Sequence, residues 1–528
     1  MLWVALHLPC LSLESFAATL VAGDAAVASE PAIALVDEHR ISAANAVAQA
    51  EGVKPGLKRA TALALAPGIT LGQADATRDA EALLPVAHAA LAFTPNVSLP
   101  PASEPNTAPH TVLLEVQASL RYFGGLDRLL ERLLQAVQPL GHEVRIAVAA
   151  TAAGAAILAR VEPPPRCTSL EATRRALAVA PVWLLGPGRE HWEAMQGMGL
   201  RQVGDLLGLP RTGLARRFGE SLLMEIDAAF GRRPDPREAI VPARLFESRL
   251  ELFARADSTE QVLYGASVLL ARLVTWLSAQ QAFVRRFRLL MHHETRWQQG
   301  DRTPQATSLD IALAEPSRDS AHLLVLLRER LAQVQLPAPT LELALQADDI
   351  VKRAAPNSEL FPTRQSENEG LTRLIERLQA RLGVDQVQCL GAIEDHRPER
   401  ASGLRRADAA AARPQRAARA KGRREASAGS AGKENEAMAA SARPVWLQPI
   451  CEPLQERRSR PLLDGRPLSL LSGPERIEAG WWDAGLAERD YFIAEAADGA
   501  LVWIYRARLP LSTEGANESG WFLHGRFG

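Results

Sequence analysis

The sequence predicts an α+β protein of several domains that ends in a small, mainly β domain. Three observations support this fold class. At 528 residues the chain is long enough for several hydrophobic cores. Short apolar runs alternate with amphipathic segments up to residue 350, which is typical of sheets covered by helices. Residues 397–443 consist mainly of Ala, Arg, Ser and Gly and cannot build a core, so they predict a flexible, basic linker before a separate C-terminal domain.

The composition excludes several classes of protein. A formal net charge of -1 provides no global field that would attract nucleic acid, so a DNA-binding surface must be local. The four cysteines are far apart and form no Cys-x-x-Cys pair, which excludes a zinc knuckle and a disulfide framework and fits a reduced, cytoplasmic compartment. The N-terminal apolar run stops at Pro9 without a basic lead, so we expect no signal peptide. Ile146 to Ala159, the longest weakly polar stretch, is too short to span a membrane.

Buried strands alternate with helices in the first 165 residues. The central strand, Val112 to Val116, follows an irregular segment and precedes a Gly124-Gly125 turn. Leucines at helical spacing from Leu126 to Val137 predict a helix that packs on the same sheet. Further strands are expected at 2–8 and 144–151, with helices opening at 11–14 and covering 152–160.

Glycine turns mark a helical module after residue 165. Leu185-Gly-Pro-Gly188 and the Gly197-Met-Gly199 turn both precede amphipathic stretches, as in helix-hairpin-helix modules. Backbone amides at such turns can approach a phosphate without reading the sequence. We therefore predict DNA binding by Gly186, Gly188, Gly197 and Gly199, with plain C-capping by glycine as the alternative.

Residues 246–350 change to strands and two long helices in a βαββαβ-like order. One strand, Phe283 to Met291, carries three closely spaced arginines. Arg285, Arg286 and Arg288 are the predicted contacts to DNA phosphates. The alternative is a cationic strand edge that discourages pairing with other sheets.

A short extended segment follows, between prolines at 356 and 362. Its adjacent Leu360 and Phe361 are costly to leave in water unless a pocket takes them, so the segment predicts either a partner or packing onto its own domain. A helix is expected from Glu369 to Leu382.

Aromatic residues alternate through the C-terminal part, around an Asp498-Gly499 turn that predicts a β-hairpin. Trp503 and Trp521 are expected in the core. Trp481 and Trp482 lie between Gly480 and Asp483, where a turn is expected, so at least one of them is a predicted partner-binding anchor.

The central strand resembles the metal-binding palm strand of Y-family translesion DNA polymerases. That strand has the form Ser-Ile-Asp-Glu-Ala-Tyr-Leu-Asp-Val, and Leu114-Glu115-Val116 fits its last three positions. The Asp-Glu pair that holds metal in the family then falls on His110 and Thr111. Ser12-Leu13-Glu14 similarly matches a Ser-Val-Glu helix of the family, which places the first metal-binding aspartate at Ala5.

These replacements predict that the metal site is lost. Two-metal phosphoryl transfer needs several carboxylates around two cations about 4 Å apart, and a methyl group, an imidazole and a hydroxyl are poor substitutes. Glu115 is the one acid left on the strand, and it lies about 13 Å from Thr111 along it. His7, at the second acidic position of the first strand, is expected to be a core-edge histidine. We predict no catalytic residue, no metal and no cofactor.

The nucleotide site of the family is also altered. Ala44 to Leu57 resembles the fingers segment Ala-x-Tyr-x-Ala-Arg-x-x-Gly-Val-x-x-Gly-Met, whose Tyr and Arg grip a triphosphate. Ala46 and Gln49 occupy those two positions and supply no cationic donor. The nearby Lys54, Lys58 and Arg59 are expected on a solvated face.

The tail Leu-Ser-Gly-Pro-Glu-Arg-Ile-Glu-x-Gly-Trp-Trp-Asp, ending at Asp483, extends the resemblance to the catalytically inactive, Y-family-like subunits of bacterial mutasomes. The resemblance implies a non-catalytic adaptor in SOS-induced translesion synthesis. It implies four partners: DNA, the sliding clamp, a RecA-like subunit and an error-prone C-family DNA polymerase. The implied domains are palm and fingers at 1–165 (fingers about 20–73), thumb at 166–238, little finger at 239–350, clamp-binding segment and helix at 351–396, linker at 397–443 and partner-binding domain at 444–528.

Two other functions stay open on the sequence. One is a weakly active Y-family polymerase that uses Glu115 with acids such as Asp75 or Asp79. The other is a DNA-structure-binding module that has no polymerase partner.

The proline-flanked segment yields a first prediction. It resembles the clamp-binding motif Gln-x-x-Leu-Phe, with Asn357 at the glutamine position. Leu360→Ala with Phe361→Ala should abolish binding to the sliding clamp, because these side chains fill the apolar pocket in this binding mode. Binding to duplex DNA serves as the control and should not change. Undiminished clamp binding by the double variant would refute the assignment.

Overall fold

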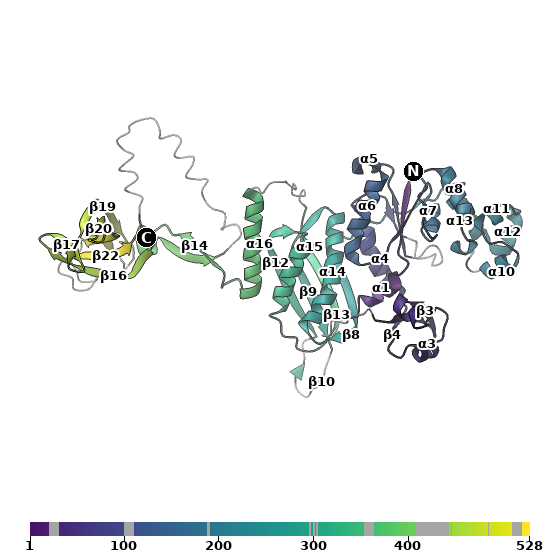
Figure 1. The fold of residues 1–528 in the computed structure, drawn as a ribbon, viewed down its shortest axis with the longest axis horizontal. Coiled ribbons are helices and arrows are strands. Elements are labelled where there is room, and N and C mark those ends of the chain that lie inside the picture. The colour runs from purple at the N-terminus through teal and green to yellow at the C-terminus, as the bar shows by residue number, and fades with distance from the viewer. Residues whose placement is uncertain are drawn as a thin grey trace. The chain divides into compact units, whose positions relative to one another are not determined.

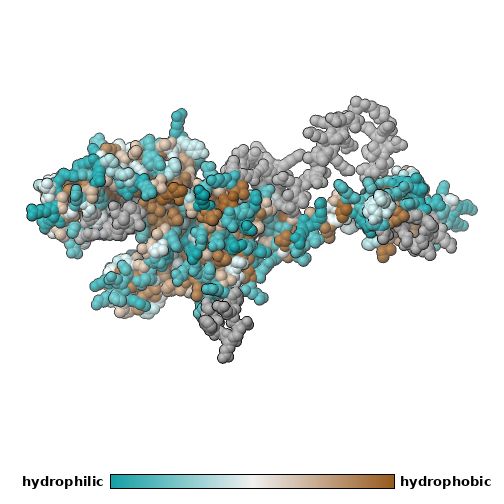
Figure 2. Space-filling model, turned by 180° about the vertical axis from the view of Figure 1, so that it is seen from behind, coloured by the Kyte–Doolittle hydropathy of each residue, from teal (hydrophilic) through white to brown (hydrophobic). Residues whose placement is uncertain are grey.

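A computed structural model describes most of the chain, in two compact units, Met1–Arg381 and Leu382–Gly528 (Figure 1). The described residues are 1–20, 31–99, 110–186, 189, 191–294, 297–298, 301–302, 305–352, 364–407, 443–444, 446–483, 485–508 and 520–527. On the face that Figure 2 shows, both units have hydrophobic residues interspersed among hydrophilic ones.

The N-terminal unit begins with an antiparallel sheet in the order β5-β6-β1-β7. The alternation of its side chains sends Leu6 and Leu114 to one face, where they pack against α4 and α6, and Ala5 and Leu113 to the other, against α7. The strands and helices are β1 (Trp3–His7), β5 (Val97–Ser98), β6 (Thr111–Glu115), β7 (Arg145–Ala149), α4 (Ala76–Leu91), α5 (Leu120–Phe123), α6 (Leu126–Val137) and α7 (Ala152–Leu158).

A smaller sheet, in the order β3-β2-β4, occupies the predicted fingers region. Helix α1 connects it to the first strand, and Phe16 of this helix contacts the ring of Phe253 at 4.9 Å between centroids. The elements are α1 (Leu11–Ala17), β2 (Ile33–Asp37), β3 (Arg40–Ala44), α2 (Ala46–Ala50), α3 (Arg59–Leu65) and β4 (Thr70–Gln73).

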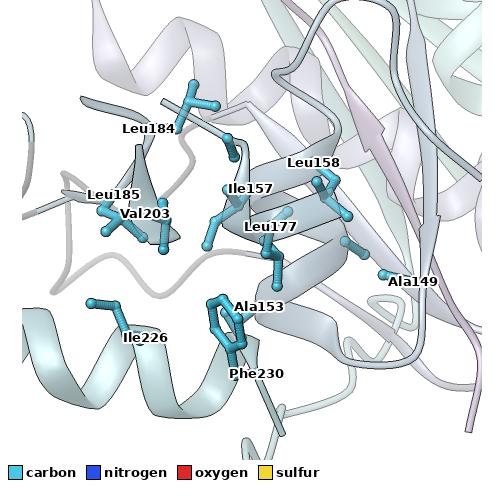
Figure 3. Packing of buried hydrophobic residues seen from close by; sticks show 14 of the residues in the cluster. Ala149, Ala153, Ile157, Leu158, Leu177, Leu184, Leu185, Val203, Ile226 and Phe230 are labelled. Atoms are coloured by element: carbon cyan, nitrogen blue, oxygen red, sulfur yellow. The ribbon is translucent and has the colours of Figure 1, made fainter. Parts of the chain in front are cut away.

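The helical module shares its core with helix α7 of the palm. Figure 3 shows Ala153 and Ile157 of α7 close to Leu177, Ile226 and Phe230. These small and branched side chains let helices approach closely, and burying them drives the association. The module consists of α8 (Leu170–Ala178), a 3-10 turn (Val182–Leu184), α10 (Trp192–Gly197), α11 (Val203–Leu207), α12 (Arg211–Phe218) and α13 (Glu220–Ala229).

The predicted little finger has the expected βαββαβ order, with its sheet arranged β12-β9-β13-β8. A further short pair, β10 (Trp297–Gln298) and β11 (Asp301–Arg302), lies between β9 and β12. The main elements are β8 (Phe246–Ala256), α14 (Thr259–Ala279), β9 (Ala282–His293), β12 (Ala306–Ser317), α15 (Ser320–Leu331) and β13 (Thr340–Lys352).

Helix α14 corrects the expectation that 146–159 is the longest apolar stretch. Among the described residues, α14 is the one helix whose length and composition would allow it to cross a membrane. Its apolar character has a local explanation, because Leu269, Leu273 and Trp276 are buried in the little-finger core.

Helix α16 (Arg364–Leu382) closes the first unit and begins earlier than the predicted Glu369. Glu376 of this helix is buried, and its carboxylate accepts hydrogen bonds from the backbone N–H of Ala314 at 2.6 Å and pairs with His322 Nε2 at 2.7 Å. These contacts hold α16 against the little finger.

The C-terminal unit is built around a seven-stranded antiparallel sheet in the order β18-β17-β16-β22-β21-β20-β19. The predicted hairpin at Asp498-Gly499 joins β20 to β21, and Gly499 adopts a φ of 85° that favours glycine. Trp503 and Trp521 are buried, as predicted. The strands are β16 (Trp446–Arg457), β17 (Arg460–Leu463), β18 (Arg466–Pro467), β19 (Ser469–Ala479), β20 (Ala487–Glu495), β21 (Leu501–Ala507) and β22 (Trp521–Arg526).

The predicted linker begins too early. Residues 397–407 form a 3-10 turn (Pro398–Arg400) and strand β15 (Ser402–Arg406), which pairs with β14 (Gln388–Ala392) in a two-stranded ribbon. The one large apolar side chain of the segment, Leu404, is exposed, and ion pairs to the rest of the C-terminal unit hold the segment in place instead, an interaction that composition does not reveal. Residues 408–442 of the predicted linker lie outside the described residues.

Candidate functional site

The degenerate metal positions meet at one end of the palm sheet. Strands β1 and β6 pair so that Ala5 lies opposite Leu113 and His7 lies opposite Thr111. The His7 Nδ1 and Thr111 Oγ1 atoms are 3.1 Å apart, within hydrogen-bonding distance. Ala5 is fully buried in the apolar cluster beneath α7. The geometry thus brings the sequence-predicted residues together, but as a hydrogen-bonded pair beside a methyl group.

The charges around His7 disfavour a cation. Burial, followed by the charges of Arg160, His110 and Arg145, lowers the pKa of His7 to about 4. Arg160 donates a hydrogen bond to the Leu184 carbonyl, and burial lowers its pKa to about 10. Arginine remains charged at neutral pH even at that pKa, so it repels a divalent metal near His7.

Asp79 is an acid that lies next to His110, and its oxygens already have partners. The carboxylate accepts hydrogen bonds from Ser12 and from Ser15, the latter at 2.8 Å, and His110 Nε2 lies 3.4 Å from it. Burial would raise the pKa of Asp79, but the hydrogen bonds from His110, Ser12 and Ser15 lower it below its ordinary value. Asp79 therefore joins α4 to α1 as an ionised, fully engaged carboxylate.

Asp75 and Glu115, the other acids that a weakly active polymerase would use, lie away from His7 and Thr111. Asp75 caps α4 by accepting hydrogen bonds from Thr77 N at 2.8 Å and Arg78 N at 3.2 Å. Glu115 pairs in register with Trp3 at the opposite end of β6, where Leu2 N donates to its carboxylate at 3.2 Å. Glu115 also lines a cavity of about 510 Å³ with Trp3, Ser98 and Asp235. Within the part of the chain that the structure describes, no group of three or more His, Cys, Asp or Glu side chains is placed to hold a metal ion.

The altered nucleotide positions are engaged locally. Gln49 Nε2 donates a hydrogen bond to the Ala44 carbonyl at 2.7 Å, and Ala46 begins helix α2 with Asn45 as its N-cap. Lys54, Lys58 and Arg59 are exposed, as expected for a solvated face.

The two glycine turns of the helical module use their amides within the protein. Gly186 N–H donates to the Glu225 carboxylate at 3.0 Å. Gly197 ends α10, and Gly199, with a φ of 80°, donates its N–H to the Gln196 carbonyl at 2.9 Å. The Gly199 hydrogen bond matches C-capping, the alternative to phosphate binding, whereas the Gly186 amide is bound by a side-chain carboxylate. The predicted role of these glycines in DNA binding therefore gains no support from the geometry. Gly188 lies outside the described residues.

Asp205 accepts hydrogen bonds from two further backbone amides near the second glycine turn. Its carboxylate accepts hydrogen bonds from the backbone N–H groups of Arg201 and Gln202, each at 2.9 Å, at the start of α11. A side-chain carboxylate thus occupies the place that a phosphate would take at a helix N-terminus.

The little-finger arginines lie on an inner strand. Arg285, Arg286 and Arg288 are exposed on β9, which pairs with both β12 and β13, so the strand-edge alternative is wrong. The Asp310 carboxylate of β12 accepts a hydrogen bond from Arg288 Nε at 2.8 Å, which raises the pKa of this arginine. Within the described residues, neither Arg285 nor Arg286 has an acidic side chain in ion-pairing distance.

The remaining residues predicted to bind partners belong to the clamp-binding segment and to the tryptophan turn. Asn357, Leu360 and Phe361 of the clamp-binding prediction lie outside the described residues. Trp481 and Trp482 lie on the turn between β19 and β20 and are 79% and 54% exposed. Their rings meet edge to face, with centroids 5.5 Å apart.

Comparison with known proteins identifies relatives of most of the chain. No family model matches the sequence. Protein ImuB from two strains of Caulobacter vibrioides, NA1000 / CB15N and ATCC 19089 / CIP 103742 / CB 15, is 28% identical over 491 residues, covering 90% of this chain and 100% of each ImuB. The chain is a relative of ImuB. Because the part without a match is smaller than either unit, the similarity to ImuB extends into both of them.

Solved structures with a similar arrangement are polymerases. The insertion ternary complex of Dbh DNA polymerase is 14% identical with a TM-score of 0.37, covering 67% of this chain and 100% of that one. DinB from Sulfolobus solfataricus is 13% identical with a TM-score of 0.35 over the same shares. The fold of this ImuB relative is established by its own strand order and helix packing, described above.

Arg397 is a residue that the sequence reasoning missed in this ImuB relative. Its guanidinium is buried against Asp483, directly after the exposed tryptophans. The two residues are 86 positions apart, so no local pattern could reveal the pair.

The shifted pKa of His7 predicts a pH-dependent stability. The unfolded chain binds a proton at His7 near pH 6.5, whereas the folded chain binds it only near pH 4. As the pH falls from 7 to 5, the unfolded state therefore gains protons that the folded state excludes. His7 should cost about 1–2 kcal/mol of folding free energy over this range.

The variant His7→Gln isolates this contribution, because glutamine keeps a polar side chain and does not titrate. Urea unfolding, followed by hydrogen exchange of the β1 and β6 peptides, should show a smaller loss of stability in the variant between pH 7 and pH 5. His88, which burial also shifts to a pKa of about 4, is present in both proteins and cancels in the difference. Equal pH dependence in the two proteins would contradict the prediction.

Proposed function

We propose that the chain is a non-catalytic adaptor in translesion DNA synthesis that holds other proteins on damaged DNA. The observation that carries this proposal is the end of the palm sheet, where Ala5, His7, His110 and Thr111 supply no carboxylate. The relationship to ImuB over both units supports it.

The palm geometry supports a non-catalytic role on chemical grounds. Magnesium requires hard oxygen ligands at about 2.1 Å in a tight octahedron, and two-metal catalysis requires several such ligands at once. Asp79, an acid next to His110, is hydrogen-bonded to Ser12, Ser15 and His110, and Arg160 adds positive charge near His7. A metal would have to break these hydrogen bonds and overcome this repulsion.

The proposed partners follow from different parts of the chain. DNA would contact the exposed β9 arginines, and the sliding clamp would take Leu360 and Phe361. A RecA-like subunit and an error-prone C-family DNA polymerase are the proposed partners of the C-terminal unit, with Trp481 and Trp482 as the anchor. We further propose that the chain acts in the cytoplasm after SOS induction.

The competing function is a weakly active Y-family polymerase. It requires Glu115 to act with Asp75 or Asp79. Glu115 lies at the other end of β6 from Thr111, and Asp75 is consumed as a helix cap, so the three acids do not converge. A DNA-binding module without a polymerase partner remains distinguishable by its failure to bind any polymerase.

Primer extension tests the catalytic part of the proposal. Purified full-length chain with primed template, four deoxynucleotides and either Mg²⁺ or Mn²⁺ should incorporate no nucleotide, because the described residues include no carboxylate cluster placed to hold the metals. The double variant Glu115→Ala with Asp79→Asn serves as the control for a contaminating polymerase. Extension by the wild type that disappears in this variant would overturn the proposal in favour of a weak polymerase.

The little-finger arginines predict a graded decrease in DNA affinity. Replacing Arg285 and Arg286 together by alanine should weaken duplex binding about tenfold and lower the slope of log affinity against log salt by about 0.9 for each phosphate that the protein no longer neutralises. Arg288→Ala is the matched control on the same strand, with a smaller expected effect because Asp310 already neutralises that arginine. Fluorescence anisotropy at several salt concentrations measures both quantities. An equal or larger effect of Arg288→Ala would show that this assignment of the surface is wrong.

A further inference from the structure

The turn that carries the exposed tryptophans is wrapped around a buried arginine. Arg397 is 2% exposed, and its Nη1 and Nη2 atoms donate to the two carboxylate oxygens of Asp483 at 2.8 and 2.7 Å. Nη1 also donates to the Gly485 carbonyl at 2.8 Å. The bidentate geometry fixes both the position and the plane of the guanidinium. The turn residues Gly480–Asp483 and Gly485 are therefore held by a residue from outside the main sheet.

The two glycines of the turn leave the space that this guanidinium occupies. Gly480 has a φ of 81°, and a Cβ atom there would come within 2.6 Å of Arg397 Nη1. A Cβ atom at Gly485 would lie 2.7 Å from the same nitrogen. A Cβ atom at Gly480 would also lie 2.3 Å from the Gly485 carbonyl oxygen, so a larger residue at either position would disturb both the turn backbone and the arginine within it.

A second ion pair fastens the same segment to the sheet. Glu399 accepts hydrogen bonds from Arg489 Nη1 at 3.1 and 3.3 Å, and the same Arg489 atom donates to the Tyr491 hydroxyl at 3.2 Å. The Tyr491 hydroxyl in turn contacts His524 Nδ1 at 2.8 Å in the aromatic core. Residues 395–400 are thus joined to the C-terminal sheet at two points, although they precede residues 408–442 of the predicted linker.

This anchoring holds the tryptophans in an exposed position. Arg397 lies 5.6 Å from the ring centre of Trp482, and Trp481 meets Trp482 edge to face. The fixed guanidinium therefore supports the Trp482 ring directly and Trp481 through its contact with Trp482, which preorganises the exposed surface for binding. Two large exposed aromatic side chains on a rigid turn have the character of binding anchors.

The surrounding charges favour a protein partner over nucleic acid. Binding single-stranded DNA by aromatic stacking also requires cations that follow the phosphate backbone. Arg397 is ion-paired with both Asp395 and Asp483, Arg400 with Asp483, and Arg489 with Glu399, so three carboxylates balance the three arginines. With these cations neutralised by carboxylates of the same unit, the turn offers an apolar surface without phosphate binding.

We propose that Arg397 is the positioning residue of a tryptophan platform, Trp481 with Trp482, which docks into an apolar, uncharged pocket of a protein partner. The inference rests on the proposed adaptor function and adds to it the chemistry of the docking pocket and a residue that controls the platform. Residues 395–400 then belong to the partner-binding domain, which the sequence placed at 444–528.

The test uses full-length chain and three purified proteins: the sliding clamp, the RecA-like subunit and the C-family polymerase. Trp481→Ala with Trp482→Ala should weaken binding to the RecA-like subunit or to the polymerase at least tenfold. The same variant should bind the clamp and a single-stranded oligonucleotide as the wild type does. Arg397→Ala should cause a similar decrease with both indoles present.

Matched variants separate positioning from a general loss of structure. Arg400→Ala removes the exposed arginine that also contacts Asp483, and it should change binding less than twofold. Arg397→Lys retains the charge without the bidentate fork and should give an intermediate decrease. If Arg397 acts through the tryptophans, adding Arg397→Ala to the tryptophan double variant should cause little further decrease. Hydrogen exchange of the β20 and β21 peptides should match the wild type in Arg397→Lys.

Three results would overturn the inference. If the tryptophan variant binds both protein partners as the wild type does, Trp481 and Trp482 do not form a docking site. If the decreases add up in the combined variant, Arg397 does not act by positioning the tryptophans. A tenfold decrease in oligonucleotide binding would assign the platform to nucleic acid. If wild-type chain binds neither the RecA-like subunit nor the polymerase, the adaptor function itself fails and the inference with it.

Discussion

The antiparallel pairing of β1 with β6 is the constraint on which the palm site depends. Its register places Ala5, His7, Thr111 and Leu113 on one face, because side chains directly opposite each other in such a pair project to the same side. Ala5 and Leu113 then belong to the apolar cluster that α7 and the helical module share. A carboxylate at Ala5 would be buried there at high cost without a cation. The same strand pairing that shapes a polymerase-like palm therefore supports a site without metal ligands.

Polar groups near the expected ligand sites are satisfied within the protein. His7 pairs with Thr111, Asp79 binds Ser12 and Ser15, and Glu225 accepts the Gly186 amide. Buried polar groups without partners are costly, so such internal hydrogen bonds stabilise the fold and compete with any external ligand. Sites that would hold a metal or a phosphate thus act as structural contacts between α1 and α4 or between helices of the thumb module.

The exposed functional groups lie on rigid supports. The β9 arginines project from an inner strand that neighbours on both sides hold in place, and Trp481 and Trp482 stand on a turn closed by Arg397. An adaptor needs such preorganised binding surfaces because flexible side chains lose entropy on binding. Metal-dependent catalysis instead needs several carboxylates to converge on one point, and among the described residues Glu115, Asp75 and Asp79 do not converge. Exposed binding surfaces on supported elements, without a cluster of acids in the described part of the palm, fit the proposed adaptor role better than a polymerase.

The sequence by itself determined the local elements and which residue types occupy the positions matched to metal ligands. Periodicity located the helix at Leu126–Val137, the little-finger order and the hairpin at Asp498-Gly499, because these features depend on residues close together in the chain. Only the tertiary structure decided that β9 is an inner strand, that Glu225 takes the amide of Gly186 and that Arg397 belongs to the C-terminal domain. Those contacts join residues 39 and 86 positions apart, and neither composition nor periodicity carries information about which distant side chains will meet. Arg397, which the composition places in a linker, is buried and paired with Asp483, and it therefore supports the tryptophan turn.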